Sequence, residues 1–554
     1  MNNWINESIF YHIYPLGFCD APEYNDCNVT YRLEKLNEYI PHLKSINVNA
    51  LYIGPLFDSS KHGYDTKDYY KVDTRLGDNE SFKKTCELLH ANGIKVVLDG
   101  VFNHVGREFW AFKDVQQNLQ NSRYCGWFEN LNFGGNSPMG DPFWYEGWSG
   151  HYDLVKLNLK NPEVVEHIFN AVSMWIDEFK IDGLRLDVAE VIDIDFLKSL
   201  RHFCTNKKSD FWLMGEIIHG NYARLANPDT LHSVTNYECY KGIYSSFNDH
   251  NFFEIAHSFN RQFSNGGIYK DIYTYNFIDN HDVNRIADTV KNKNTLSSIY
   301  TMLYTMPGVP SVYYGSEWGI GGTRTNNNDK SLRPCITLGQ IPNADNELCS
   351  FISKLGYVRK QLDGIKYGEF ENIVIKNEQL VYRRFTNSQS VYISFNVNDN
   401  EQWVGFNVTG GNKLTDALTG EVFDCNGYAN IPLRANSSRI LVLHNGEFTI
   451  NAQTPCEAQE IETTQQENIC EVVKNEEVEK IVLPLSDVTV GRYRHFKGEE
   501  YEVIGIAKDS ETLEELVVYE AMYGEHSLWV RSKAMFSEVV EIDGKKVNRF
   551  IKLS

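Results

Sequence analysis

The chain has 554 residues, a formal net charge of −21, and hydrophobic and charged contents of 42% and 23%. These proportions are typical of a soluble globular protein that is too long for one hydrophobic core. The acidic balance argues against nucleic acid or an anionic membrane surface as a partner, because both repel a negatively charged protein.

From Ile9 to about Arg333, strand-like apolar runs alternate with stretches of helical periodicity. Helices are expected at 31–46, 80–92, 162–179 and 346–362. Eight strands are expected at 10–14, 48–54, 94–99, 183–187, 211–216, 233–238, 275–282 and 311–315. Such alternation implies parallel pairing, and eight strands close naturally into a barrel. The alternative, a doubly wound open sheet, needs a glycine-rich phosphate loop after the first strand, and residues 15–19 do not form one.

The rest of the chain divides by pattern into further regions. The fold class is therefore predicted as α/β, a (β/α)8 TIM barrel of residues 1–104 and 155–366 with a subdomain, 105–154, inserted after the third strand. Residues 367–445 alternate as in an antiparallel β-sandwich. Residues 446–482 predict an acidic, disordered linker, and 483–554 a small β-rich domain.

Targeting and redox signals are few. No stretch reaches the about 18 uninterrupted apolar residues that a membrane-spanning helix needs, so no membrane partner is expected. The first residues do not show a basic region followed by a long apolar run. The eleven cysteines are scattered without a C-x-x-C pair, as in a protein whose thiols stay reduced. These features predict a cytoplasmic protein.

Three carboxyl groups occupy positions suited to the cleavage of a sugar acetal. Asp187, Glu216 and Asp282 each follow a short apolar run typical of a buried parallel strand. Barrel enzymes place catalytic groups at the carboxyl ends of different strands. Because a nucleophile and a general acid are the minimum for glycosidic cleavage with retention, these residues predict a glycoside hydrolase.

Six motifs, in order, resemble those of the α-amylase family of retaining glycoside hydrolases. They are Gly63–Asp65, Asp99–His104, Gly183–Asp187, Gly215–Glu216, Phe277–Asp282 and Gly308–Glu317, and the resemblance spans roughly residues 5–445. It implies a barrel with an inserted subdomain and a β-sandwich. It also implies that Asp187 is the nucleophile, Glu216 the acid/base and Asp282 a group that stabilises the transition state.

The neighbouring residues suit these roles. The apolar run Phe211–Met214 would favour the uncharged form of Glu216 by desolvation. Arg185 lies two residues before Asp187 on the same strand face, where it could keep that carboxylate ionised, whether or not it is also a structural ion pair.

The resemblance also implies a set of sugar-binding residues. A histidine considered alone is more often a buried core residue whose hydrogen bonds are made within the protein. Here the surrounding motifs favour ligand binding instead. His104 and His281 resemble ligands of sugar hydroxyls, Tyr64 an aromatic that stacks on the sugar, Asp65 a group that orients its neighbours, and Asp329 with Arg333 a further sugar-binding pair.

A calcium ion at the usual site of the family is not expected. Many members have Pro-Asp-Leu before the third helix, and that aspartate binds calcium, whereas here Asp153–Asn158 places Lys156 at this point. An ammonium group cannot bind a cation and repels it. Asn103 remains available as a ligand, and an alignment slipped by a few positions would change the comparison. No other metal or cofactor is predicted.

The sequence Lys156-Leu-Asn158 resembles the neopullulanase and cyclomaltodextrinase branch, although that branch carries an extra N-terminal sandwich and the first strand here begins near Ile9. The predicted function is hydrolysis of α-1,4-glucosidic bonds in α-glucan oligosaccharides derived from starch. The alternatives are an α-glucosidase or transglycosylase acting on short or cyclic dextrins, and a non-catalytic sugar-binding protein. Chain-length preference and oligomeric state stay open.

The tail, Gly491–Tyr501 through Val530–Phe536, resembles a small bacterial domain family of unknown function. Its Arg492, Arg494, His495 and Lys497 could form a basic patch, but a solvated strand face is the favoured interpretation.

Overall fold

The computed structural model describes residues 4–325, 328–446, 448, 450, 488–495, 499–508, 515–522, 528–542 and 545–553. The chain divides into two compact units, residues 1–458 and 459–554. Most of the predicted acidic linker lies outside the described residues.

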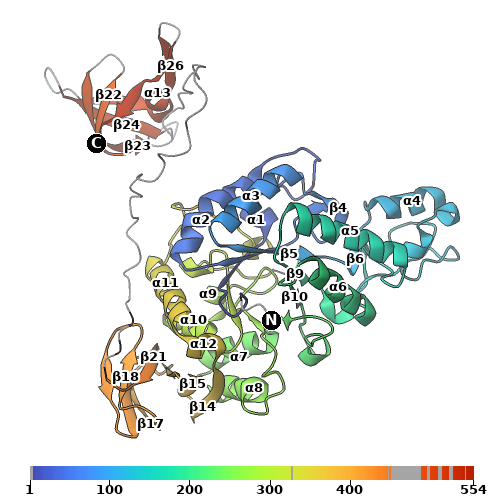
Figure 1. Ribbon diagram of the computed structural model, residues 1–554. Helices are drawn as coiled ribbons and strands as arrows, with labels where there is room; N and C mark the ends of the chain where they lie inside the picture. Colours follow the sequence, from blue (N-terminus) through green and yellow to red (C-terminus); the bar gives the residue numbers. More distant parts are fainter. Residues whose placement is uncertain are drawn as a thin grey trace, which may run out of the picture. The chain divides into compact units, whose positions relative to one another are not determined.

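The first unit is built on an eight-stranded parallel sheet (Figure 1). The strand order is β11-β10-β9-β5-β2-β1-β13-β12, and a parallel bridge between Thr235 and Tyr275 joins the two ends of this order. The predicted barrel is therefore confirmed. Its strands are β1 (Phe10–Ile13), β2 (Ala50–Ile53), β5 (Lys95–Gly100), β9 (Gly183–Leu186), β10 (Trp212–Gly215), β11 (Ser233–Val234), β12 (Tyr275–Asn276) and β13 (Val309–Tyr313).

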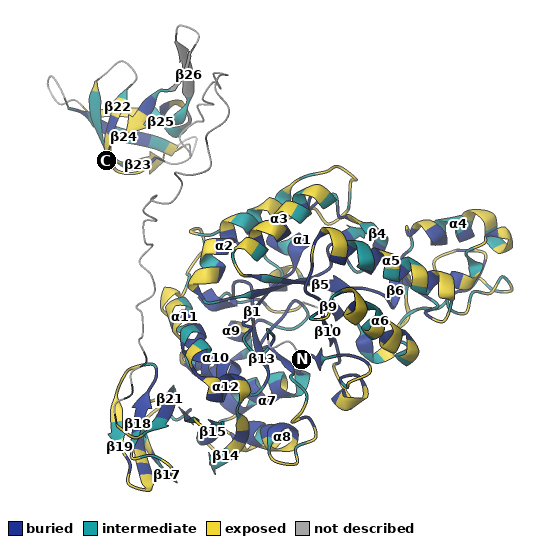
Figure 2. Ribbon diagram, viewed as in Figure 1, coloured by how far each residue is buried: buried dark blue, intermediate teal, exposed yellow. Residues whose placement is uncertain are grey.

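Helices surround this sheet and turn their buried faces toward it (Figure 2). Local chemistry sets their limits: Asp78 and Ser81 form a capping box at the start of α3, and Gly93, at φ +74°, follows its end. The helices are α1 (Pro15–Phe18), α2 (Lys35–Ser45), α3 (Asn79–Ala91), α5 (Pro162–Glu178), α6 (Ile194–Lys207), α7 (Tyr237–Asn248), α8 (Phe253–Phe263), α9 (Ile286–Thr289), α10 (Leu296–Thr305), α11 (Asn346–Gln361) and α12 (Asp363–Tyr367). Among the described residues, no helix is long and apolar enough to cross a membrane.

Two barrel strands are shorter than the sequence predicts by four or more residues, and side-chain amides shape the chain beyond each of them. The strand expected at 233–238 ends at Val234, because the Asn236 side chain caps α7 by accepting from the Cys239 amide. The strand expected at 275–282 ends at Asn276. Farther along, the Asn280 side chain accepts from the amides of Asp282 and Val283 and forms a turn. Asp282 therefore lies in a loop.

The segment between β5 and α5 forms a small layer of its own. It contains β6 (His104–Gly106), α4 (Trp110–Asn118), β7 (Gly147–Trp148) and β8 (His151–Lys156), with the strands in the antiparallel order β6-β8-β7. Phe112, Phe143 and Tyr145 are buried, so these aromatics of the segment fill a core. A separate hairpin of β3 (Phe57–Ser59) and β4 (Thr66–Val72) carries Tyr64 in its turn.

A β-sandwich follows the barrel. Its six-stranded sheet has the order β14-β15-β16-β21-β18-β19, and its second sheet pairs β17 with β20. Tyr382, Ile393 and Phe395 of the larger sheet join the barrel core, whereas Val404 and Ile431 of the smaller sheet belong to a separate core. The strands are β14 (Glu369–Ile375), β15 (Gln379–Phe385), β16 (Ser390–Asn396), β17 (Gln402–Asn407), β18 (Lys413–Asp416), β19 (Val422–Asp424), β20 (Tyr428–Leu433) and β21 (Ser437–His444).

The second unit is β-rich, as predicted. Its five-stranded sheet has the order β25-β24-β23-β22-β28, and Tyr493, Phe536 and Phe550 are in its core. Arg492 and Arg494 form ion pairs with glutamates of the neighbouring strand, which fits a solvated strand face; Lys497 lies outside the described residues. The elements are β22 (Gly491–His495), β23 (Glu500–Lys508), β24 (Glu515–Ala521), β25 (Leu528–Ser532), α13 (Lys533–Ser537), β26 (Val539–Ile542), β27 (Lys545–Asn548) and β28 (Phe550–Lys552).

Asp182, directly before β9, ties several elements together at the amino-terminal end of the barrel. Its buried carboxylate accepts from His90 (2.8 Å), Lys95 (3.0 Å), Lys208 (2.7 Å) and the amide of Val96 (2.9 Å). Burial alone would raise the pKa of Asp182, but the bonds from His90 and Lys208 lower it overall. Asp182 accepts all of these bonds only as a carboxylate. It therefore stabilises the fold fully at pH values above the pKa of an unfolded aspartate, about 3.9, and progressively less as the pH falls below that value.

We expect Asp182→Asn to lower the free energy of unfolding at pH 7 by about 1–3 kcal/mol, because charge-assisted hydrogen bonds are lost. The difference from the parent should shrink as pH falls below about 4. Thermal unfolding followed by circular dichroism across this pH range measures both effects. Asp177→Asn, which removes an exposed ion pair with Lys207, is the matched control and should change little. Equal melting temperatures for parent and Asp182→Asn at pH 7 would contradict this role.

Candidate active site

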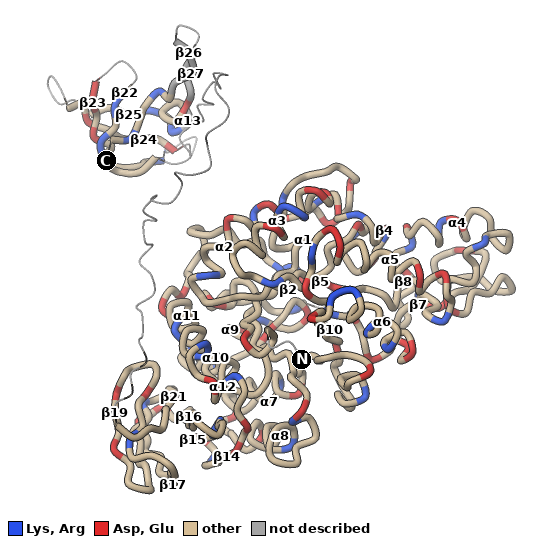
Figure 3. The backbone as a smooth tube through the Cα atoms, viewed as in Figure 1, with Lys and Arg blue, Asp and Glu red and all other residues tan. Residues whose placement is uncertain are grey.

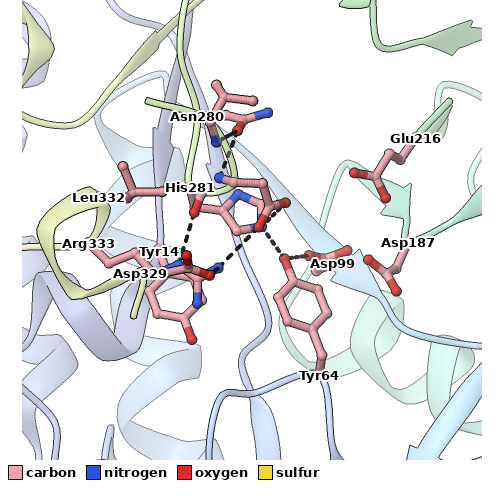
Figure 4. A network of polar contacts seen from close by, with 12 residues as sticks. Tyr14, Tyr64, Asp99, Asp187, Glu216, Asn280, His281, Asp329, Leu332 and Arg333 are labelled. Carbon is pink, nitrogen blue, oxygen red and sulfur yellow. Dashed lines mark hydrogen bonds and ion pairs between the residues drawn. The ribbon is translucent and has the colours of Figure 1, made fainter. Parts of the chain in front are cut away.

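Asp187 and Glu216 lie side by side at the carboxyl end of the barrel. Each is the first residue after its strand, β9 or β10, and these strands are parallel neighbours. One guanidinium bridges them: Arg185 Nη1 donates to Asp187 Oδ1 at 2.8 Å, and Arg185 Nη2 lies 2.9 Å from Glu216 Oε1. All three side chains are buried. Figure 4 shows both carboxyl groups on the same wall of the site.

A third carboxyl group, Asp99 at the end region of β5, joins this cluster. It accepts from Arg185 Nη1 at 2.9 Å and from the Tyr52 hydroxyl at 2.9 Å. Asp99 was predicted only as the first residue of a motif, and Tyr52 was not predicted. The same signal that marked Asp187, an acidic residue closing an apolar strand, could have identified Asp99. Three neighbouring strands thus direct carboxyl groups at one cation.

This charge balance governs the protonation of the site. Burial raises the pKa of Asp187 and of Glu216, and the guanidinium of Arg185 lowers both. For Asp187 burial is the larger effect and the net direction of its pKa is upward, while Arg185 acts in the predicted direction, toward the ionised form. A single guanidinium cannot balance three buried carboxylates, and the cluster therefore favours retention of a proton.

Asp282 and His281 form the opposite wall. His281 Nε2 lies 3.0 Å from Asp282 Oδ2, and the Asp282 side chain is 35% exposed. The Tyr64 hydroxyl contacts His281 Nε2 and also donates to Asp99 Oδ2 at 3.3 Å. The Tyr64 and His281 rings stack at 5.8 Å between centroids. Tyr64 therefore connects the two walls (Figure 4).

Arg333 and Asp329 extend the second wall. Arg333 Nη2 lies 3.0 Å from Asp282 Oδ1 and 3.3 Å from Asp329 Oδ2, and its guanidinium lies 4.4 Å above the ring of Tyr14. Arg324 forms an ion pair with Asp329 at 3.0 Å. Tyr14 and Arg324 were not predicted from the sequence, because neither lies in a motif and only the folded loops bring them here.

His104 and Asp65 hold different positions. His104 Nε2 is 3.8 Å from Asp187 Oδ2 and has no hydrogen-bond partner among the described residues, and burial lowers the pKa of His104 to about 3. A neutral ring next to Asp187 can bond a sugar hydroxyl.

The Asp65 side chain accepts a hydrogen bond from the amide of His62 at 3.1 Å. The Asp65 backbone packs against Gly106, where an added Cβ would come within 2.5 Å of the Asp65 carbonyl oxygen. Asp65 thus orients its loop and makes no contact with the carboxyl cluster.

Residues 12–347 match the family model described as "Alpha amylase, catalytic domain", which is more than half of the chain. The chain belongs to the α-amylase family. It is 28% identical over 473 residues to an intracellular maltogenic amylase of Bacillus subtilis (strain 168), covering 81% of this chain and 76% of the relative. It is 30% identical over 469 residues to neopullulanase 2 of Thermoactinomyces vulgaris, covering 79% and 78%.

Solved structures of the α-amylase family share the fold. A cyclomaltodextrinase superposes with a TM-score of 0.70 at 25% identity, covering 79% of this chain and 78% of that one. A cyclic α-maltosyl-(1→6)-maltose hydrolase from Arthrobacter globiformis gives 0.69 at 25% identity, covering 79% and 99%. Residues 491–552 match a family model of a protein of unknown function, DUF1653. The chain is therefore an α-amylase-family glycoside hydrolase that carries this additional domain.

The surroundings of Lys156 do not fit the calcium site that many α-amylase-family members have. Lys156 pairs with His104 in the β6–β8 ladder, which places it next to Asn103, and its ammonium lies 2.7 Å from Glu146 Oε1. The Glu146 carboxylate is thus already bound to a cation of the protein itself. Within the described part of the chain, no cluster of three or more histidine, cysteine or acidic side chains could hold a metal ion. The absence of calcium stays a prediction.

We expect EDTA to change the melting temperature little, because we expect no bound calcium ion. A bound cation would stabilise the native state by mass action, and its removal would lower the melting temperature. Differential scanning fluorimetry with EDTA, and then with excess calcium, measures this directly. A large fall in melting temperature that calcium restores would show that the site binds the ion despite Lys156.

Proposed function

We propose that this protein hydrolyses α-1,4-glucosidic bonds of maltodextrins, including short and cyclic ones, with retention of configuration. The observation that carries the proposal is the pair Asp187 and Glu216, held by one guanidinium at the ends of neighbouring barrel strands. The names of the relatives support the substrate class, since they include intracellular maltogenic amylase, cyclomaltodextrinase and neopullulanase. The first of these names also supports the proposal that the enzyme acts inside the cell.

The assigned roles need one proton in the cluster, carried by Glu216, and an ionised Asp187, the form that Arg185 favours. In the first step Asp187 attacks the anomeric carbon while Glu216 gives its proton to the leaving glycosidic oxygen, which forms a glycosyl-enzyme ester. In the second step Glu216 takes a proton from water, and the water oxygen displaces Asp187. Asp282, on the opposite wall, would stabilise the positive charge that develops on the sugar ring in both steps.

The amide of Val188 supports the assignment of Glu216. This amide donates to Glu216 Oε2 at 3.0 Å while Arg185 holds Oε1, so the carboxyl orientation is set from both sides. Val188 has a left-handed backbone, φ 43°, which is unfavourable for a β-branched residue. Such strain next to a functional group is consistent with selection for the position of Glu216.

The sugar itself would be held by neutral and charged groups of both walls. Burial lowers the pKa of His281 as well as that of His104, so both rings are neutral near pH 7 and can bond hydroxyls without adding charge. Tyr64 offers a ring face at the junction of the walls. Arg333 and Asp329 would bind the next sugar along the chain.

A non-catalytic sugar-binding protein is not favoured, because all three carboxyl groups are present and both walls are assembled. A product profile on maltooligosaccharides, pullulan and cyclodextrins tests the substrate class. Hydrolysis to short products supports the proposal. Predominant transfer products would favour the transglycosylase alternative, and inactivity on all three substrates would refute the proposal.

We expect Asp187→Ala and Glu216→Gln each to lower the release of reducing sugar from maltoheptaose by at least about a thousandfold, because each removes a group that acts in bond breaking. Both variants should keep the parent's circular dichroism spectrum. Glu166→Gln, on the exposed face of α5, is the matched control and should keep parental activity. Near-normal turnover by either active-site variant would refute its assigned role.

A further inference from the structure

The small sheet of the β-sandwich, formed by β17 and β20, has one buried and one exposed face. Along β17 and the residue after it, Val404, Phe406 and Val408 are buried, and along β20 the residues Ala429 and Ile431 are buried. The alternate positions face outward. They are Trp403, Gly405 and Asn407 on β17, opposite Pro432, Asn430 and Tyr428 on β20.

Two large aromatic side chains stand on this outer face. Trp403 and Tyr428 are both 57% exposed, although the core beneath the sheet is complete without them. A tryptophan and a tyrosine left this exposed together on one face of a two-stranded sheet form an apolar surface that favours a ligand with a flat apolar face.

Gly405, between Trp403 and Asn407, determines how the tyrosine lies. A Cβ added at Gly405 would come within 1.9 Å of the Tyr428 hydroxyl oxygen and 2.7 Å of Cζ. The phenol ring of Tyr428 therefore extends across the bare backbone of Gly405, toward the strand that carries Trp403. Glycine weakens a strand interior, and its presence often marks a close approach of another group to the backbone. Here the close approach is made by one of the two exposed rings.

The face carries no charge. Neither Gln402–Asn407 nor Tyr428–Leu433 contains Lys, Arg, Asp or Glu, although the whole chain has a net charge of −21 (Figure 3). Asn407 and Asn430 add amide donors and acceptors beside the rings. Aromatic faces with amides and without charges suit a neutral, polyhydroxylated ligand, whose C–H faces stack on the rings and whose hydroxyls bond the amides.

We propose that this outer face, the Trp403–Tyr428 platform, binds an α-glucan chain as a second carbohydrate site. The identity of the glucan rests on the proposed function. The larger sheet of the sandwich packs against the barrel core on one side and against β17 and β20 on the other. The platform is therefore on the side of the sandwich that faces away from the barrel, and it is separate from the candidate active site. Its effect is to hold a long polymer near the enzyme and so raise the local substrate concentration.

Native gel electrophoresis with and without amylopectin in the gel tests the platform. The full chain carrying Glu216→Gln is used, so that the polymer is not digested. Relative to this variant, the addition of Trp403→Ala and Tyr428→Ala should weaken retardation by about tenfold in apparent Kd, because two stacking surfaces are lost. Val422→Ala, an exposed apolar position elsewhere in the sandwich, is the matched control and should not change retardation.

Gly405→Ala distinguishes the effect of the position of the Tyr428 ring from the effect of having the two aromatic side chains at all. It keeps both aromatics but displaces the phenol, so it should weaken amylopectin binding while the melting temperature stays near that of the parent. In the otherwise active enzyme, Trp403→Ala with Tyr428→Ala should leave kcat/KM on maltotriose unchanged and lower the rate on dilute soluble starch.

Unchanged retardation of the double variant, or no retardation of the Glu216→Gln parent, would overturn the proposal. A change of oligomeric state in the double variant, measured by size-exclusion chromatography, would also overturn it by showing that the face binds a second copy of the chain. Absence of maltotriose hydrolysis by the enzyme without any substitution would instead count against the proposed function, so the two failures are distinguishable.

Discussion

One buried guanidinium shared by three carboxyl groups is the interaction on which the site depends. Arg185 binds Asp99, Asp187 and Glu216, which close three neighbouring strands of the barrel. A buried charge without a partner is costly, so the ion cluster and the parallel register of β5, β9 and β10 stabilise each other. Because the carboxyl groups outnumber the cation, the same cluster favours retention of the proton that acid catalysis requires.

The second wall is built by different means. Asp282 comes from a loop that Asn280 shapes, and Arg333 and His281 hold its carboxyl group. Tyr64 connects this wall to Asp99 by a hydrogen bond. The rigid strands thus position the two carboxyl groups that we propose make and break bonds, whereas loops position the groups that we propose bind sugar. This division allows substrate preference to change without disturbing the carboxyl pair.

Much of the fold and part of the site were predictable from local pattern. Strand ends at Asp187 and Glu216 were correct because short apolar runs in a parallel barrel are buried on both faces and end abruptly at polar residues. The strand before Asp282 was predicted six residues too long, because a run of apolar residues does not reveal that a later asparagine turns the backbone. Tyr14 and Arg324 were missed because no local spacing relates them to Asp282.

The sequence by itself determined the barrel, the inserted segment and the sandwich, and it predicted the three acids, since periodicity and motif order depend only on neighbours along the chain. Only the tertiary structure decided the protonation balance of Asp187, the contact between Tyr64 and the two walls, and the exposure of Trp403 and Tyr428 on one face of the small sheet, with the Tyr428 ring over Gly405. These properties depend on burial and on distances between residues far apart in the chain. A linear pattern does not contain this information, because solvent exposure and electrostatic balance arise only when separate strands meet.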